Sequence, residues 1–150
     1  MHKNSIELSI KVPNQTKYLR LVGKIAEDIA KELDRFSGDK ETLAYHMNLV
    51  LTEAMSNAIK YGKVRGNVFV QWNHISRTLS FIDDGIGISP EKLPNIFNRF
   101  YRADESRSSS VKGNGLGLSI VKKLADLQQI KLSAVSKPDE GSSFILQFTR

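Results

Sequence analysis

Apolar and polar residues alternate along the chain in two different repeats. Strict alternation over residues 5–12 predicts a strand that ends at Pro13. Apolar residues at the spacing of successive helical turns predict helices over residues 16–35, about 41–61 and about 115–128. Apolar or alternating runs predict four further strands, at residues 67–73, 78–83, about 130–135 and 143–149.

This order of elements predicts a single α+β domain over residues 1–150. Strands stand first and last with helices between them, which is typical of a two-layer α/β sandwich. We expect a mixed, mostly antiparallel sheet that is covered on one face by about three helices. Ser89-Pro90 predicts the start of a short helical turn. Residues 102–114 have almost no apolar content and predict a mobile loop.

The composition and net charge of the chain limit the kinds of partner that we expect. The chain carries 22 Lys and Arg against 16 Asp and Glu, for a formal charge of +6, but the basic residues are scattered, so we do not expect nucleic-acid binding. We see neither an apolar run that would span a bilayer nor the apolar core of a signal peptide, which favours a cytoplasmic protein that does not bind membranes. Cysteine is absent, which excludes disulfides and thiolate metal sites.

The second predicted helix carries a polar side among apolar residues. Glu53, Ser56, Asn57 and Lys60 are spaced so that they share this side, which could simply be the solvated face of the helix. The same residues also suit phosphate chemistry. The Asn57 carbonyl could bind magnesium together with phosphate oxygens. Glu53 could deprotonate a group that attacks a phosphate, and Lys60 could neutralise phosphate charge.

A carboxylate ends one of the predicted strands. Asp83 falls on the same face as Leu79 and Phe81, where an unpaired carboxylate is costly. An acceptor fixed at this position could take a hydrogen bond from an adenine amino group. Gly85 and Gly87 would then let the backbone turn sharply against a ligand. The alternative is an ordinary Asp-Gly turn.

Three alternating glycines lead into the third predicted helix, in the segment from Gly113 to Leu118. Their N–H groups lie where a helix presents positive partial charge, so they predict a phosphate cradle. A lone glycine motif is weak evidence, and the chain contains no Walker A sequence. The prediction of an ATP site therefore depends on the order of the three segments along the chain and not on any one of them.

These segments resemble, in order, the boxes of the gyrase, histidine kinase and mismatch-repair (GHKL) ATPase superfamily. The second helix resembles the N box, Asp83-x-Gly85-x-Gly87 the G1 box, residues 96–102 the F box of histidine kinases, and residues 113–118 the G2 box. Gly141 to Phe144 resembles the final Gly-Thr-x-Phe, with Ser142 in place of threonine. The resemblance covers residues 48–149.

The resemblance implies ATP and Mg²⁺ as cofactors and an ATP lid at about residues 97–114. It implies that Glu53 is the catalytic base and that Asn57 is the metal ligand. Arg99 could also touch phosphate. The nucleotide-binding residues that it implies are Asn57, Lys60, Asp83, Gly85, Gly87, Ile88, Phe100, Arg102, Lys112, Gly113, Asn114, Gly115, Leu116, Gly117, Leu118 and Ser142.

The N-terminal part resembles a particular group of this superfamily. No phosphoacceptor box surrounds His2, His46 or His74, and no room exists for a strand between the first two helices. This layout resembles anti-sigma factor serine kinases, although the F and G2 boxes are similar to those of histidine kinases. We therefore expect a kinase that phosphorylates Ser or Thr of an antagonist protein and regulates a sigma factor. Homodimers are common in this superfamily.

Two alternatives stay open. The first is a histidine kinase catalytic module that acts in trans on a separate phosphoacceptor. The second is a binding switch that uses nucleotide to change its affinity for a partner, with little phosphoryl transfer.

Overall fold

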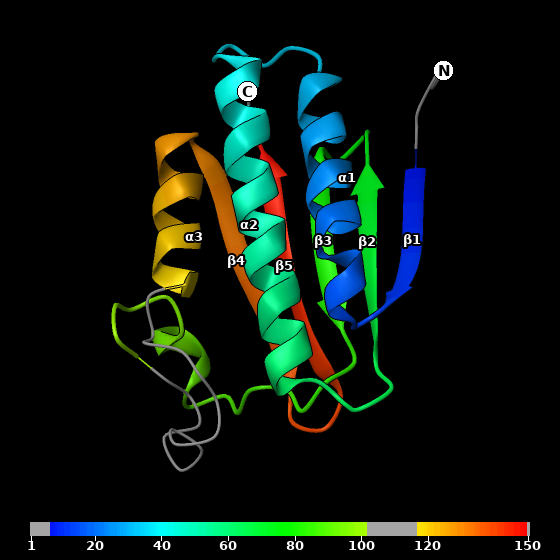
Figure 1. Cartoon of the computed structure of the whole chain (residues 1–150). Coiled ribbons are helices and arrows are strands. Elements are labelled where there is room, and N and C mark those ends of the chain that lie inside the picture. Colours follow the sequence, from blue (N-terminus) through cyan, green and yellow to red (C-terminus); the bar gives the residue numbers. More distant parts are fainter. Residues whose placement is uncertain (1–6, 102–116, 150) are drawn as a thin grey trace.

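The computed structural model describes residues 7–101 and 117–149 (Figure 1). Five strands form one sheet in the order β1-β2-β3-β5-β4. Each pair of neighbours in this sheet is antiparallel, so the mixed sheet that we expected is antiparallel throughout its described strands. The strands are β1 (Glu7–Pro13), β2 (Asn67–Asn73), β3 (Thr78–Asp83), β4 (Ile130–Lys137) and β5 (Gly141–Phe148).

Three helices lie on one face of this sheet, which confirms the predicted two-layer α+β fold (Figure 1). They are α1 (Leu19–Lys31), α2 (Lys40–Tyr61) and α3 (Gly117–Leu127). Short 3₁₀ turns occur at η1 (Thr16–Tyr18) and η2 (Leu93–Asn95). The second turn follows the predicted start at Ser89, whose carbonyl accepts from the N–H groups of Lys92 and Leu93.

The first predicted helix was too long at both ends. Its first residues form η1, and α1 ends at Lys31 instead of Arg35, whose φ of 54° lies outside the helical region. α2 begins where we expected, because the Asp39 side chain accepts hydrogen bonds from the N–H groups of Glu41 and Thr42.

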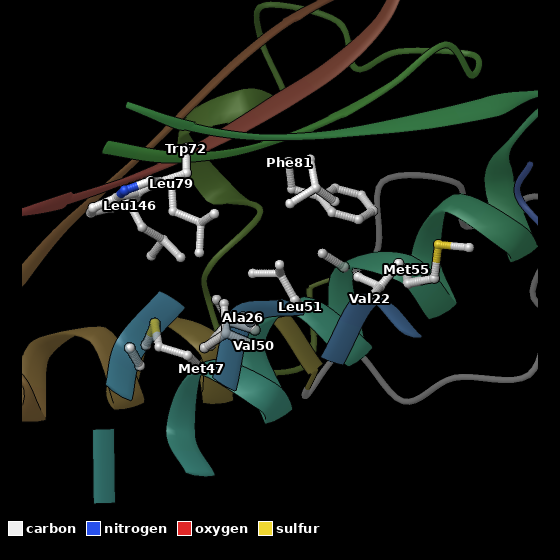
Figure 2. Close-up of a cluster of buried hydrophobic side chains, with 14 of the residues drawn as sticks. Val22, Ala26, Met47, Val50, Leu51, Met55, Trp72, Leu79, Phe81 and Leu146 are labelled. Carbon is white, nitrogen blue, oxygen red and sulfur yellow. The ribbon is translucent and has the colours of Figure 1, made fainter. Parts of the chain in front are cut away.

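The core lies between the helices and the sheet (Figure 2). The helices bury apolar side chains from successive turns, such as Val22, Met47 and Leu51, against the inner face of the sheet, where Leu79 and Phe81 lie. This packing fixes α2 over the centre of the sheet. The site described below therefore rests on a rigid support.

Four of the segments that the sequence analysis singled out meet at one end of the molecule. The last turns of α2, the end of β3, the start of α3 and the turn between β4 and β5 all lie at this end (Figure 1). In the sheet register, Asp83 pairs with Ser142, so the two side chains lie on the same face. β5 begins at Gly141, two residues before its predicted start, and therefore includes Ser142.

Candidate functional site

Glu53 and Gly117 bring α2 and α3 into direct contact. A Cβ atom added to Gly117 would lie 1.8 Å from the Glu53 Oε1 atom and 2.5 Å from its Cδ atom. The carboxylate thus lies against the first residue of α3, where the helix presents unpaired N–H groups and positive partial charge. Only glycine leaves room for it. The contact joins a potential proton acceptor to the end of the segment predicted to cradle phosphate.

The electrostatic setting of Glu53 suits a proton acceptor. The side chain is half-buried, and burial raises the pKa of its carboxyl group, while the positive charge of Lys60 partly lowers that pKa. A carboxylate with a raised pKa accepts a proton more readily at neutral pH. Lys60 itself is exposed on the last turn of α2.

Asn57 lies one helical turn after Glu53 and is half-buried. In the described part of the chain, no group of three or more His, Cys, Asp or Glu side chains could hold a metal ion alone. A single side-chain oxygen from Asn57 is compatible with Mg²⁺, because this ion commonly takes one or two protein oxygens and completes its shell with phosphate and water oxygens. The Asn57 carbonyl is the oxygen that the sequence analysis assigns to this role.

Asp83 occupies a partly buried position at the end of β3. Its Oδ1 atom accepts a hydrogen bond of 2.9 Å from the Gly85 N–H. Burial raises the pKa of the Asp83 carboxyl, the N–H groups of Gly85 and Ser142 lower it, and the neighbouring charge of Asp84 raises it. A half-buried carboxylate that retains free acceptor capacity is suited to an amino group of a ligand.

Glycines let the backbone segments around Asp83 approach closely. Gly87 and Gly141 have φ values of 73° and 99°, which disfavour other residues. A Cβ atom on Gly87 would lie 1.9 Å from the Lys137 carbonyl oxygen, and one on Gly141 would lie 2.0 Å from the Asp83 carbonyl oxygen. Gly85 packs against Gly62 at the end of α2. Asp83 is therefore held between α2 and the turn from β4 to β5.

A hydrogen-bond cluster lies beside Asp83 and includes a residue that the sequence analysis missed. The Ser136 Oγ atom accepts from the Ile88 N–H at 2.7 Å and donates to the Gly141 carbonyl at 2.9 Å. It also lies 2.8 Å from the Ser142 Oγ atom. A serine within a strand gives no motif signal, and its position opposite Ser142 follows only from the sheet register.

A small apolar cavity lies between α2, α3 and the sheet next to this cluster. Leu118, the second residue of α3, lines it, together with Phe81 and Phe144, which come two residues before Asp83 and two after Ser142. Phe144 also makes an edge-on contact with Phe97, at 6.4 Å between ring centroids. All of the side chains that line this cavity are apolar.

The predicted residues of the F box and G2 box are only partly described. Ile96 is buried, whereas Arg99 and Phe100 are exposed, with the Arg99 guanidinium 5.3 Å from the Phe100 ring centre. Most of the predicted lid lies outside the described residues. So do the predicted nucleotide contacts Arg102, Lys112, Gly113, Asn114, Gly115 and Leu116.

A family model described as histidine kinase-, DNA gyrase B-, and HSP90-like ATPase matches residues 43–150. Among curated proteins, the chain is 36% identical to the sensor histidine kinase YkoH of Bacillus subtilis over 149 residues, which cover 96% of this chain and 33% of that protein. It is 35% identical to the phosphate regulon sensor protein PhoR of Pseudomonas aeruginosa over 127 residues, covering 83% of this chain and 28% of that protein. The chain thus spans a third or less of these relatives.

Solved structures share the fold. The mycobacterial sensor histidine kinase MprB matches with a TM-score of 0.62 at 22% identity, covering 91% of this chain and 95% of that chain. Full-length ShkA in complex with AMPPNP matches with a TM-score of 0.58 at 20% identity, covering 91% of this chain and 30% of that chain.

These comparisons alter one expectation from the sequence. The relatives are sensor histidine kinases, so the expected closeness to anti-sigma factor serine kinases is not supported, and neither is a sigma-factor partner. The similarity to YkoH extends over nearly the whole chain, including the N-terminal residues on which that expectation rested. Within the described ranges, no helix combines the length and apolar character needed to cross a membrane.

Proposed function

The chain belongs to the family of histidine kinase-, DNA gyrase B- and HSP90-like ATPases, and we propose that it is the catalytic domain of a histidine kinase. Domains of this family bind ATP with Mg²⁺. In the proposed reaction, the γ-phosphate is transferred to a histidine of a phosphoacceptor domain. Since the chain spans a third or less of its sensor kinase relatives, the proposal places this histidine outside residues 1–150.

The contact between Glu53 and Gly117 carries the proposal. It holds a carboxylate of raised pKa at the N-terminus of a helix that follows the predicted phosphate cradle. A structural glutamate on the solvated side of α2 needs neither the contact nor a glycine at this position. The arrangement is what phosphoryl transfer requires, because catalysis of that reaction is mostly positioning and charge stabilisation.

Each residue of the site has a separate task in this proposal. ATP with Mg²⁺ supplies the phosphoryl group. Asp83 accepts a hydrogen bond from the adenine amino group, and Asn57 contributes an oxygen to the metal. Lys60 offsets phosphate charge. Glu53 takes the proton from the acceptor imidazole as its nitrogen becomes a nucleophile.

The two described histidines of the chain are poor candidates for the acceptor. The Nδ1 atom of His46 lies 2.8 Å from Nε2 of the buried Gln128, and His46 comes seven residues before Glu53 on α2. His74 lies in the turn between β2 and β3, near Asp34. A separate phosphoacceptor domain and a dimer are therefore part of the proposal, and histidine kinase relatives act with phosphoacceptor domains and dimerise.

A second candidate is the serine or threonine kinase that the sequence layout favours. The observation behind it is that residues 32–39, all of which are described, contain no strand between α1 and α2. The chemistry at Glu53 would be the same for a hydroxyl as for an imidazole, so the pocket alone does not separate the two acceptors.

The chemical stability of the transferred phosphate distinguishes them. The chain is incubated with γ-labelled ATP, Mg²⁺ and lysate of the source organism, and the labelled protein is then treated with acid and with base. We expect a label that acid removes and base leaves, because phosphohistidine is acid-labile. An acid-stable label would favour serine or threonine and overturn the proposal.

Glu53→Gln is the matched control, since it keeps the side-chain shape and removes the base. The label should be lost while ATP still binds. A different result would indicate a nucleotide-dependent switch. In that case the wild-type chain would bind ATP without labelling any protein, and the Glu53→Ala variant would still regulate its partner.

A further inference from the structure

Ser136 lies at the centre of the hydrogen-bond cluster beside Asp83. Its hydroxyl connects three segments that are distant in the sequence: β4 itself, the loop after β3 at Ile88, and the start of β5 at Gly141 and Ser142. Ser136 is partly buried, and Ser142 is 7% exposed. Because both hydroxyl groups are at least partly shielded from water, the hydrogen bonds of the cluster keep the same partners.

The number of protons in the cluster decides which way each hydroxyl points. The Ser136 hydroxyl has one proton and two lone pairs. It accepts from the Ile88 N–H at 2.7 Å and gives its proton to the Gly141 carbonyl at 2.9 Å. One lone pair of Ser136 is then left for Ser142, whose Oγ atom lies 2.8 Å away, so Ser142 is the donor of this bond.

This orientation changes what Ser142 offers to a ligand. Its proton points at Ser136, so only its lone pairs are available in other directions. Asp83, its partner in the sheet register, lies on the same face and is also an acceptor. Two neighbouring acceptors attract an N–H₂ group and repel a carbonyl oxygen.

We propose that Ser136 is a positioning residue for base selection, which fixes Ser142 as a hydrogen-bond acceptor beside Asp83 and so makes the site reject 6-oxopurines. This inference deepens the proposed function, because it assumes that the purine base of the nucleotide binds at Asp83. It does not depend on which residue receives the phosphate. Direct binding therefore tests it without a phosphoacceptor.

ITP is a suitable probe, because it differs from ATP by a carbonyl in place of the amino group at position 6 of the purine and by the proton on the adjacent ring nitrogen. The dissociation constants of Mg-ATP and Mg-ITP are measured by calorimetry for the wild-type chain and for Ser136→Thr and Ser136→Val. These two variants have nearly the same shape, and only the first keeps the hydroxyl. Valine also leaves little space for a water molecule to replace it. Ser133→Val in the same strand is the control, because Ser133 alternates to the other face of the sheet.

We expect the wild type, Ser136→Thr and Ser133→Val to prefer ATP to similar extents. In Ser136→Val the Ser142 hydroxyl loses its acceptor and becomes free to donate to the carbonyl of ITP. The preference for ATP should then fall by about tenfold, as expected for the reversal of one hydrogen bond. Because the preference is a ratio, a general loosening of the loop at Ile88 cancels from it.

Two controls separate this role from a merely structural one. Ser142→Ala removes the hydroxyl that Ser136 orients, so adding Ser136→Val to it should leave the preference unchanged. Equal losses of ATP and ITP affinity in Ser136→Val, or a preference lowered as much by threonine as by valine, would overturn the inference and leave the kinase proposal intact. A wild-type chain that binds neither nucleotide would overturn both.

Discussion

Replacing Gly117 with alanine puts a methyl group where the Glu53 carboxylate lies. The added Cβ atom would lie 1.8 Å from Oε1, whereas ordinary contact begins at 3.4 Å, so the carboxylate must move by about 1.6 Å. The three heavy atoms nearest to this Cβ atom all belong to Glu53. The substitution therefore acts on the position of the proposed base.

The expected effect is on rate rather than on folding. A misplacement of about 1 Å at a reacting group can cost about 100-fold in rate, equivalent to ~2.7 kcal/mol of activation free energy. Gly117 has no positive φ among the described backbone angles, and alanine is the better helix former by up to about 1 kcal/mol. The midpoint of thermal unfolding should thus stay within about 3 °C of the wild type.

The assay is transfer of label from γ-labelled ATP to the phosphoacceptor, alongside calorimetric ATP binding and thermal unfolding. We expect transfer to fall about 100-fold in Gly117→Ala, with an intact fold. Glu53→Ala and the double variant complete the test, because two changes that act through one group are not additive. Transfer within threefold of the wild type, or a double variant far slower than Glu53→Ala, would refute the role of the contact.

Two further predictions concern the charge and the backbone of the site. Burial raises the pKa of Glu53, so the folded state holds this proton more tightly, and ionised Glu53 costs folding free energy above that pKa. Glu53→Gln should therefore unfold at a higher temperature than the wild type at pH 7. Scanning calorimetry at a series of pH values should show this gain vanish below the ordinary pKa of 4.5, and a gain that persists there would contradict the burial argument. Gly141→Ala would place a Cβ atom 2.0 Å from the Asp83 carbonyl oxygen, at a φ of 99°. We therefore expect the free energy of unfolding, measured with denaturant, to fall by at least about 2 kcal/mol. An unchanged denaturation midpoint would mean that this turn relaxes freely.

The sequence predicted the fold well where a periodic pattern acts locally. The alternation at residues 67–73 and 78–83 matches the bounds of β2 and β3, and Asp39 caps α2 as expected. Element ends were predicted less well, since Arg35 continues a helical pattern but adopts a φ of 54°. Apolar periodicity carries no information on where the backbone leaves the helix.

The site was predictable where glycines and carboxylates follow a known order, and not where it depends on packing. Nothing near Glu53 in the sequence shows that Gly117 will lie against it, because that contact follows from how α2 and α3 pack on the sheet. Ser136 was missed for the same reason. Its partners Ile88 and Ser142 come from a loop and from another strand, and a single serine in a strand resembles any polar residue on a sheet.

The sheet order has a consequence for folding. β2 and β3 form one hairpin and β4 and β5 form another, and each closes over a short turn, which is a fast local event. The pairing of Asp83 with Ser142 joins the two hairpins and must close a much longer loop. The proposed adenine-binding groups Asp83 and Ser142 therefore come together only when the hairpins dock. Nucleotide binding should appear late in refolding, and ATP should slow unfolding by holding this junction together.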